Sequence, residues 1–225
     1  MLRFNAPLSD YVKQADQLFA GWQSGEEQAV RMFRANHPKF LDEKIPWLER
    51  RITDAEARAV PITRDDASLA VARAYHFLDW PSLESYATAV ADKGSPVSRF
   101  EHAAEAVIDG DAATLTRLLR DDPDLVRARS TRVCDFDPRV HRSTLLHYLA
   151  ANGVEGYRQR SPKNAVEIAR MLLGAGADPN ALQDSYGGRN TAMAMLVSSS
   201  PPRDAGVQVP LIDVLVDYGA TIAPS

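Results

Sequence analysis

Metal-binding side chains gather within one short stretch of the sequence. Cys134, Asp135 and Asp137 are followed by His141, and each of these side chains can hold a cation. Tetrahedral zinc sites generally use closely spaced Cys and His pairs, and hard cations prefer more oxygen ligands in alternating order. Neither pattern is complete here. We therefore interpret the stretch as the polar tip of a loop and expect no metal.

A second histidine, His147, ends the segment Thr144-Leu145-Leu146-His147. An imidazole can serve as a general acid or base. In this pattern it can instead hydrogen-bond the neighbouring backbone and fix a turn, while Thr144 caps the helix that follows. We favour the structural role for His147.

Gly174-Ala175-Gly176 has the glycine spacing of part of a phosphate-binding loop, but it follows a predicted helix. The C-terminal end of a helix carries the negative end of its dipole, whereas phosphate binds at the other end. Walker, nucleophile-elbow and His-Glu-x-x-His motifs do not occur. The sequence predicts no cofactor and no catalytic residue, and it leaves enzymatic activity undecided.

Basic residues concentrate between Arg127 and Lys163. This stretch carries eight basic and three acidic side chains, a net charge of +5, whereas the whole chain carries −4. One interpretation is a solvated loop surface, and the other is a local field that attracts an acidic partner. On the second interpretation, reversing the charge of Arg132, Arg139, Arg158 and Arg160 should weaken binding and leave folding nearly intact.

Apolar spacing predicts helices throughout the first ninety residues. One helix is expected to follow Ser9, a second to start near Glu26, and a short one over Phe40–Ile52, interrupted at Pro46. Thr63 with Asp66 three residues later predicts a helix start of the capping-box type. Turn-forming residues around Gly94 then divide the chain into an N-terminal helical region, 1–94, and a second region, 95–225.

The second region repeats a pattern of two helices and a turn. The segment Asn164–Ala181 is an amphipathic helix that ends in a Gly-Ala-Gly-Ala-Asp turn. We expect Gly176 to adopt a left-handed conformation there, because glycine does so without steric cost. A single helix pair cannot bury its own apolar face, so it must stack on further copies. The predicted fold is all-α.

Two segments of this second region resemble parts of a known repeat. Thr144-Leu145-Leu146-His147, with Ala150 and Gly153, resembles the start of an ankyrin repeat, and Gly174–Ala181 resembles its end. The resemblance covers roughly Phe100 to Ile222 and implies about three divergent ankyrin-like repeats, an α-solenoid. Leu69–Val90 looks like the helical segment that precedes ankyrin repeats in some bacterial proteins.

The repeats depart from this pattern in their length. Thr144 and Thr191 are 47 residues apart, against about 33 in a typical ankyrin repeat. The excess forms inter-helix insertions over Val154–Lys163 and Ser200–Val209, and the connector Val126–His141 is also long. Long loops in compact domains are usually functional or disordered.

The leading hypothesis is a protein-interaction module that binds through its concave face, finger loops and insertions. Arg and Tyr are favoured as interface anchors. The predicted binding residues are Arg132, Asp135, Phe136, Arg139, His141, Asn152, Tyr157, Arg158, Arg160, Tyr186 and Arg189. The alternative is a small-molecule-binding or catalytic protein. Its pocket would lie between the insertions, the basic loops and the N-terminal helices, with Arg side chains on a carboxylate or phosphate.

The composition of the chain restricts the class of partner and the cellular location that we expect. The net negative charge argues against nucleic acid, and no apolar run is long enough for a membrane helix. A single cysteine, Cys134, without an apolar leader favours the cytoplasm. The last helix, around Leu211–Tyr218, is apolar on nearly all sides, so we also expect self-association through the C-terminal repeat.

Overall fold

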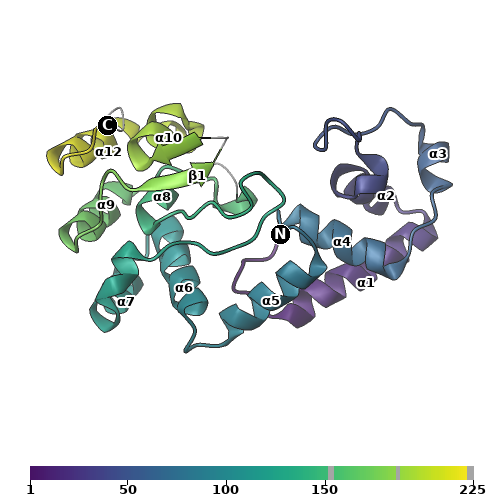
Figure 1. Ribbon diagram of the computed structural model, residues 1–225, viewed down its shortest axis with the longest axis horizontal. Coiled ribbons are helices and arrows are strands. Elements are labelled where there is room, and N and C mark those ends of the chain that lie inside the picture. The colour runs from purple at the N-terminus through teal and green to yellow at the C-terminus, as the bar shows by residue number, and fades with distance from the viewer. Residues whose placement is uncertain (152–154, 186–187, 222–225) are drawn as a thin grey trace. The chain divides into compact units, whose positions relative to one another are not determined.

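The computed structural model describes residues 1–151, 155–185 and 188–221. Two compact units make up the chain (Figure 1). The N-terminal unit holds Met1–Thr88 with Val133–Phe136, and the C-terminal unit holds Ala89–Arg132 with Asp137–Ser225. The structure thus divides the chain after Thr88, six residues before the predicted boundary, and assigns four residues of the long connector to the N-terminal unit.

Helices dominate the described residues, which confirms the prediction of a helical protein. The N-terminal unit contains α1 (Leu8–Ser24), α2 (Glu27–Asn36), the 3-10 turn η1 (Pro38–Phe40), α3 (Asp54–Arg58) and α4 (Arg64–Ala74). The helix α5 (Trp80–Ala91) runs across the division between the units. None of the described helices combines the length and the apolar composition that crossing a lipid bilayer requires.

The helices α1, α2 and α4 contact one another and form the core of the N-terminal unit. Tyr11, Ala15 and Leu18 follow the helical period and bury one face of α1. The predicted start of α4 is confirmed. Thr63 Oγ1 accepts a hydrogen bond from the Asp66 amide over 3.2 Å, and the Asp66 carboxylate accepts one from the Thr63 amide over 2.7 Å.

The predicted helix over Phe40–Ile52 is wrong beyond its first residue. The segment is a loop closed by backbone hydrogen bonds, from the Asp42 amide to the Leu48 carbonyl and from the Arg50 amide to the Phe40 carbonyl. The Asp42 side chain accepts from the amides of Lys44 and Ile45. These local bonds compete with helix formation, as short polar side chains do in turns.

The C-terminal unit contains three successive helix pairs and a hairpin. Its helices are α6 (Pro96–Asp109), α7 (Ala112–Asp121), α8 (Leu145–Leu149), α9 (Ala165–Gly174), α10 (Ala192–Ser198), α11 (Ser200–Asp204) and α12 (Gln208–Asp217), with 3-10 turns η2 (Pro123–Arg127) and η3 (Gly156–Arg158). The strands β1 (Leu182–Ser185) and β2 (Gly188–Thr191) pair antiparallel, Leu182 opposite Thr191. The hairpin departs from the predicted all-α fold. The helix α11 lies within the insertion Ser200–Val209, which was expected to be a loop.

Contacts between the helices follow their order along the chain. The helix α6 contacts α7, α8 contacts α9, and α10 contacts α12. In addition, α8 contacts α6 and α10, and α9 contacts α7 and α12 (Figure 1). Each pair therefore packs on the next, and one apolar cluster runs from Phe100 to Leu215.

His147 has the structural role predicted for it. Its Nδ1 accepts from the Thr144 amide over 3.2 Å, and its Nε2 donates to the Asn190 carbonyl in β2 over 3.2 Å. No part of His147 is exposed. Burial lowers its pKa to about 4, although the bond to Asn190 works in the opposite direction. The neutral ring thus joins the start of α8 to the hairpin.

Candidate functional site

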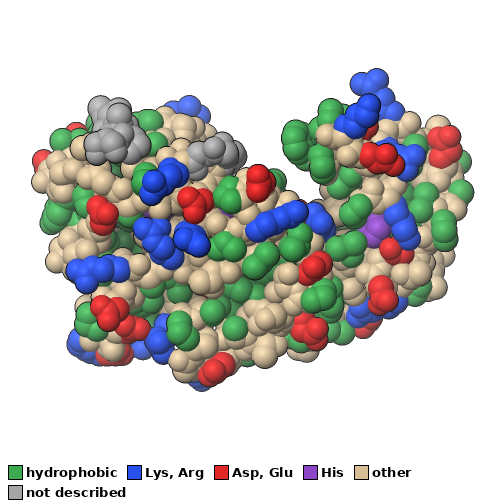
Figure 2. Space-filling view, viewed as in Figure 1, with side chains coloured by type: hydrophobic (Ala, Val, Ile, Leu, Met, Phe, Trp, Pro, Cys, Tyr) green, Lys and Arg blue, Asp and Glu red, His purple; other side chains and the backbone are tan. Residues whose placement is uncertain are grey.

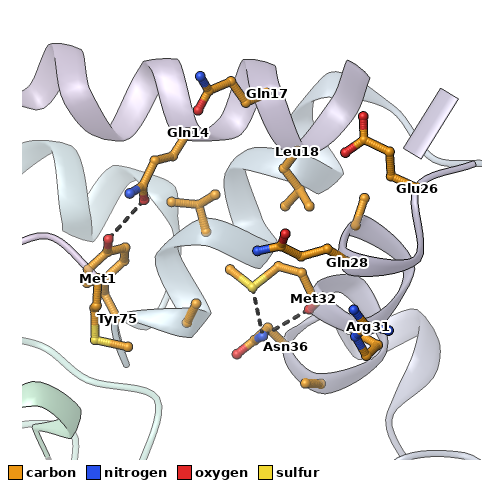
Figure 3. Close-up of a pocket in the computed structure, with 14 residues that line it drawn as sticks. Met1, Gln14, Gln17, Leu18, Glu26, Gln28, Arg31, Met32, Asn36 and Tyr75 are labelled. Atoms are coloured by element: carbon orange, nitrogen blue, oxygen red, sulfur yellow. Dashed lines mark hydrogen bonds between the residues drawn. The ribbon is translucent and has the colours of Figure 1, made fainter. Parts of the chain in front are cut away.

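An open groove of about 720 Å³ lies in the N-terminal unit and is bounded by α1, α2 and α4 (Figure 3). Each helix contributes residues spaced three or four apart, which share one helical face. They are Gln14, Gln17 and Leu18 from α1, Gln28, Met32, Ala35 and Asn36 from α2, and Val71, Ala74 and Tyr75 from the end of α4. Its volume lies in the range of about 300–1,000 Å³ typical of ligand sites.

Small side chains line part of the groove. Ala29 is buried, Ala74 is half-buried and Ala35 is exposed, and each offers only a methyl group where a larger side chain could have filled the space. Leu18 and Val71 are buried and complete the floor. Figure 3 shows Leu18 extending from α1, and Gln28 and Met32 from α2, toward the space between the helices. The floor is therefore apolar and its rim is polar.

The rim is rich in side-chain amides, and internal bonds hold two of them. Tyr75 Oη accepts from the Leu2 amide over 2.7 Å and donates to Gln14 Oε1 over 2.9 Å. Asn36 Nδ2 donates to the Met32 carbonyl over 2.9 Å. Tyr75 is buried beside Tyr11, whose ring it meets edge-on at 5.0 Å. The amide groups of Gln14 and Asn36 are thus oriented before any ligand arrives.

Two predicted binding residues, Asp135 and Phe136, belong to the N-terminal unit. The Asp135 carboxylate lies 3.6 Å from Arg73 Nη1 and 3.6 Å from His76 Nδ1. The Phe136 ring lies 5.0 Å from the His76 ring, although 41% of Phe136 remains exposed. Since these contacts are intramolecular, Asp135 holds the connector in place, and Phe136 alone of the two presents substantial surface.

Arg132 and Arg158 lie in the interior of the C-terminal unit. Arg158 has no exposed surface and contacts the carboxylates of Glu101, Glu105 and Glu155. Arg132 is 3% exposed and lies 3.3 Å from Glu155. This differs from the expectation that both contact a partner from the surface, because Arg158 has no exposed surface and Arg132 almost none.

The charges of this buried cluster stabilise one another. Burial would raise the pKa of Glu155, but the guanidinium groups of Arg132 and Arg158 outweigh it and hold that pKa below its usual value. Burial would lower the pKa of Arg158, and the carboxylates of Glu101 and Glu155 instead raise it. Burial, with the charge of Glu155, raises the pKa of the Tyr148 hydroxyl. Glu155 and Arg158 are thus both charged around neutral pH, whereas Tyr148 keeps its proton.

Three further predicted residues also make intramolecular bonds. The Tyr157 hydroxyl donates to Glu105, and Arg160 pairs with Asp109 at the end of α6 while remaining half exposed. His141 is buried, and its carbonyl accepts from the Asp184 amide of β1 over 2.7 Å. Burial, and then the charge of Arg132, lowers the pKa of His141. The inserted segment is therefore bound to α6 through several of its polar side chains.

The remaining predicted residues are Arg139 and Arg189, which are exposed, and Asn152 and Tyr186, which lie outside the described residues. Figure 2 shows acidic and basic side chains interspersed on the visible face of each unit. Within the described ranges, no three His, Cys, Asp or Glu side chains group closely enough to hold a metal ion. Arg132, Arg158 and Arg160 pair with carboxylates of the same unit. The other basic residues of the stretch between Arg127 and Lys163 are exposed, so its surface remains basic; they are Arg127, Arg129, Arg139, Arg142 and Lys163.

Sequence reasoning missed the groove. The available signal was the presence of amides beside apolar residues at helical spacing, Gln14 and Gln17 with Leu18 and Gln28 with Met32. Such a pattern is ordinary on the surface of a helix, and the sequence alone does not say which helices pack together.

Comparisons of this chain with known protein families, with curated proteins and with solved structures find no match.

Proposed function

We propose that this chain is a protein-interaction module whose N-terminal groove binds a segment of a partner protein. The observation that carries the proposal is the combination of an open apolar floor with a rim of neutral amides. Partner side chains can pack on such a floor, while the rim satisfies the polar groups that become buried with them. The groove offers no strong net charge, since the ionic side chains Glu26 and Arg31 at its edge have opposite signs.

The alternative, a small-molecule or catalytic pocket formed by the insertions, has less support. Tyr157 and Arg158 bind Glu105, and Arg160 pairs with Asp109. Arg side chains were expected to hold an anionic ligand, and the guanidinium groups of Arg158 and Arg160 are directed to carboxylates of the same unit. Because these side chains already bind carboxylates of the same unit, an acidic protein partner could not use them either.

The C-terminal unit serves, on this proposal, as an ankyrin-like scaffold. The supporting features are the stacked helix pairs, the hairpin before α10, and the bonds of His147 to Thr144 and Asn190. Repeat arrays commonly present binding surfaces of their own. Arg139 and Arg189 are the predicted binding residues that stay exposed and available for such contacts.

A peptide selection tests the groove. A random peptide library displayed on phage is selected against the wild-type chain, and the enriched peptides are measured against two variants. Ala35→Glu places a charge inside the groove, and Ala20→Glu places the same charge on an exposed position of α1 outside it. We expect enriched peptides to bind wild type and Ala20→Glu and to lose binding to Ala35→Glu. Equal binding to all three would reject the groove as the site.

A further inference from the structure

The amide groups on the rim present a defined set of donors and acceptors. The Tyr75 hydroxyl donates to Gln14 Oε1, so the NH₂ group of Gln14 remains to donate to a ligand. Asn36 uses its NH₂ on the Met32 carbonyl, so its Oδ1 remains to accept. One side of the groove thus offers a donor on α1, and the other offers an acceptor on α2.

Two more amides extend this set. Gln17 on α1 and Gln28 on α2 are exposed, and their side-chain amides make no hydrogen bond to another described residue. Each can donate and accept. A side-chain amide carries the same N–H and C=O groups as a peptide bond, so the rim as a whole is complementary to a polypeptide main chain.

From this complementarity we infer that the groove binds a partner segment in an extended conformation, through its main chain. The inference rests on the proposed function. A helix satisfies its own N–H and C=O groups except at its ends, and would leave the amides of the rim without a role. An extended segment exposes one N–H and one C=O at every non-proline residue, which the four amides can bind.

The floor restricts the side chains of that segment. Successive side chains of an extended chain point to opposite sides, so alternate ones face the floor while the others face solvent. The floor side chains Leu18, Met32 and Val71 carry no charge, and a charged group placed there would lose its hydration without compensation. The alternate residues that face the floor are therefore uncharged and apolar, and the methyl groups of Ala35 and Ala74 leave room for them.

Two libraries distinguish an extended from a helical ligand. One displays random linear peptides, and the other displays random residues on one face of a fixed helical scaffold. Both are selected against the wild-type chain, with Ala35→Glu used to discard binders outside the groove. We expect enrichment from the linear library alone. Enrichment from the helical library alone would overturn the extended conformation while leaving the proposed function in place, whereas no enrichment from either library would reject both.

The role of the main chain is tested on a selected linear peptide. Analogues with a single N-methyl group at successive backbone nitrogens keep every side chain and remove one donor at a time. We expect at least one analogue to bind about tenfold more weakly, the effect of a lost hydrogen bond. Gln14→Glu replaces the donating NH₂ by an acceptor and should weaken binding by a similar factor. Gln23→Glu, the same change at an exposed position of α1 outside the groove, should not.

Two results would overturn main-chain recognition even if the peptide binds in the groove. One is equal affinity for all N-methylated analogues. The other is unchanged affinity of Gln14→Glu relative to Gln23→Glu, with both variants shown to be folded by their thermal unfolding. Binding of the unmodified peptide that is lost in Ala35→Glu would then still support the proposed function.

Discussion

Arg158 and Glu105 form a charged hydrogen bond in the interior of the C-terminal unit, with 2.9 Å between Nε and Oε1. The two residues come from the inserted segment and from α6, 53 positions apart in the sequence. The guanidinium also lies 5.3 Å from the centre of the Tyr148 ring, within the range of a cation–π interaction. Arg158 therefore acts as a structural anchor that holds the insertion against α6.

Replacing Arg158 should destabilise the fold strongly. Arg158→Met leaves buried carboxylates without their main counter-charge, and removing one partner of a buried ion pair costs roughly 3–5 kcal/mol. The exposed residue Arg139 provides the control, since Arg139→Met should change the free energy of unfolding by no more than about 0.5 kcal/mol. Denaturant unfolding of both variants measures the difference. Equal midpoints would contradict the buried position of Arg158.

The free energy of unfolding should decrease as the pH is lowered from 6.5 toward 4, before most carboxylates titrate. Burial lowers the pKa of His147 from 6.5 to about 4. Between these values the unfolded chain binds a proton that the folded chain does not. The contribution of His147 is therefore complete above pH 6.5 and decreases as pH falls toward 4, by on the order of 3 kcal/mol. The pKa values of His37 and His141 are also lowered, mainly by burial, and act in the same direction.

The measurement is the free energy of unfolding at several pH values between 4 and 7, for the wild type and for His147→Gln. The slope of this free energy against pH reports the protons taken up on unfolding. We expect the variant to take up about one proton fewer in this range. The same slope in both proteins would show that His147 is not the titrating group.

The features that could be predicted from the sequence are those that neighbouring residues determine. The capping of α4 needs only Thr63 and Asp66, three positions apart. The bonds of His147 to Thr144 and the left-handed conformation of Gly176 depend likewise on a few adjacent residues. The failure over Phe40–Ile52 has a local cause as well, since the Asp42 side chain bonds the following amides in place of a helix.

The features that could not be predicted depend on residues far apart in the sequence. Glu101 and Arg158 are 57 positions apart, and nothing in the charge pattern indicates that they meet. The charge pattern between Arg127 and Lys163 therefore predicts a basic surface, although Arg132 and Arg158 are buried. The groove has the same origin, because Gln14 and Tyr75 are 61 positions apart and come together only when α1 packs on α4.

Glycine substitutions should separate backbone strain from steric overlap. Gly176 has a φ of +97°, as predicted, and a methyl group there would meet only the Arg127 side chain at 3.6 Å. Gly176→Ala should cost about 1 kcal/mol, the usual penalty of this conformation. Gly110 has a φ of +71°, and a methyl group there would overlap the Asn164 side chain and approach Pro162 to 2.9 Å.

We therefore expect Gly110→Ala to destabilise the protein clearly more than Gly176→Ala. Denaturant midpoints of the two variants measure the difference. Gly176→Val should be at least as costly as Gly176→Ala, because β-branched residues resist positive φ. A midpoint unchanged by Gly176→Val would count against the left-handed conformation of this residue.

The exposed side of α12 predicts self-association. Leu211, Val214 and Leu215 are buried, whereas 65% of Val209 and 53% of Val216 is exposed. Val209 and Val216 are seven residues apart and share one face, with the exposed residue Asp213 close by. A second copy that covers this face would remove both valines from water.

We expect sedimentation velocity to show a concentration-dependent increase in mass for the wild type at micromolar concentrations, and a monomer for Val216→Glu. Adding a charge at this position would make contact between two such faces unfavourable, since like charges would be brought together and desolvated. Ala20→Glu adds the same charge on α1 and should associate like the wild type. A wild type that is monomeric at every concentration, and unchanged by Val216→Glu, would exclude α12 as a dimer contact.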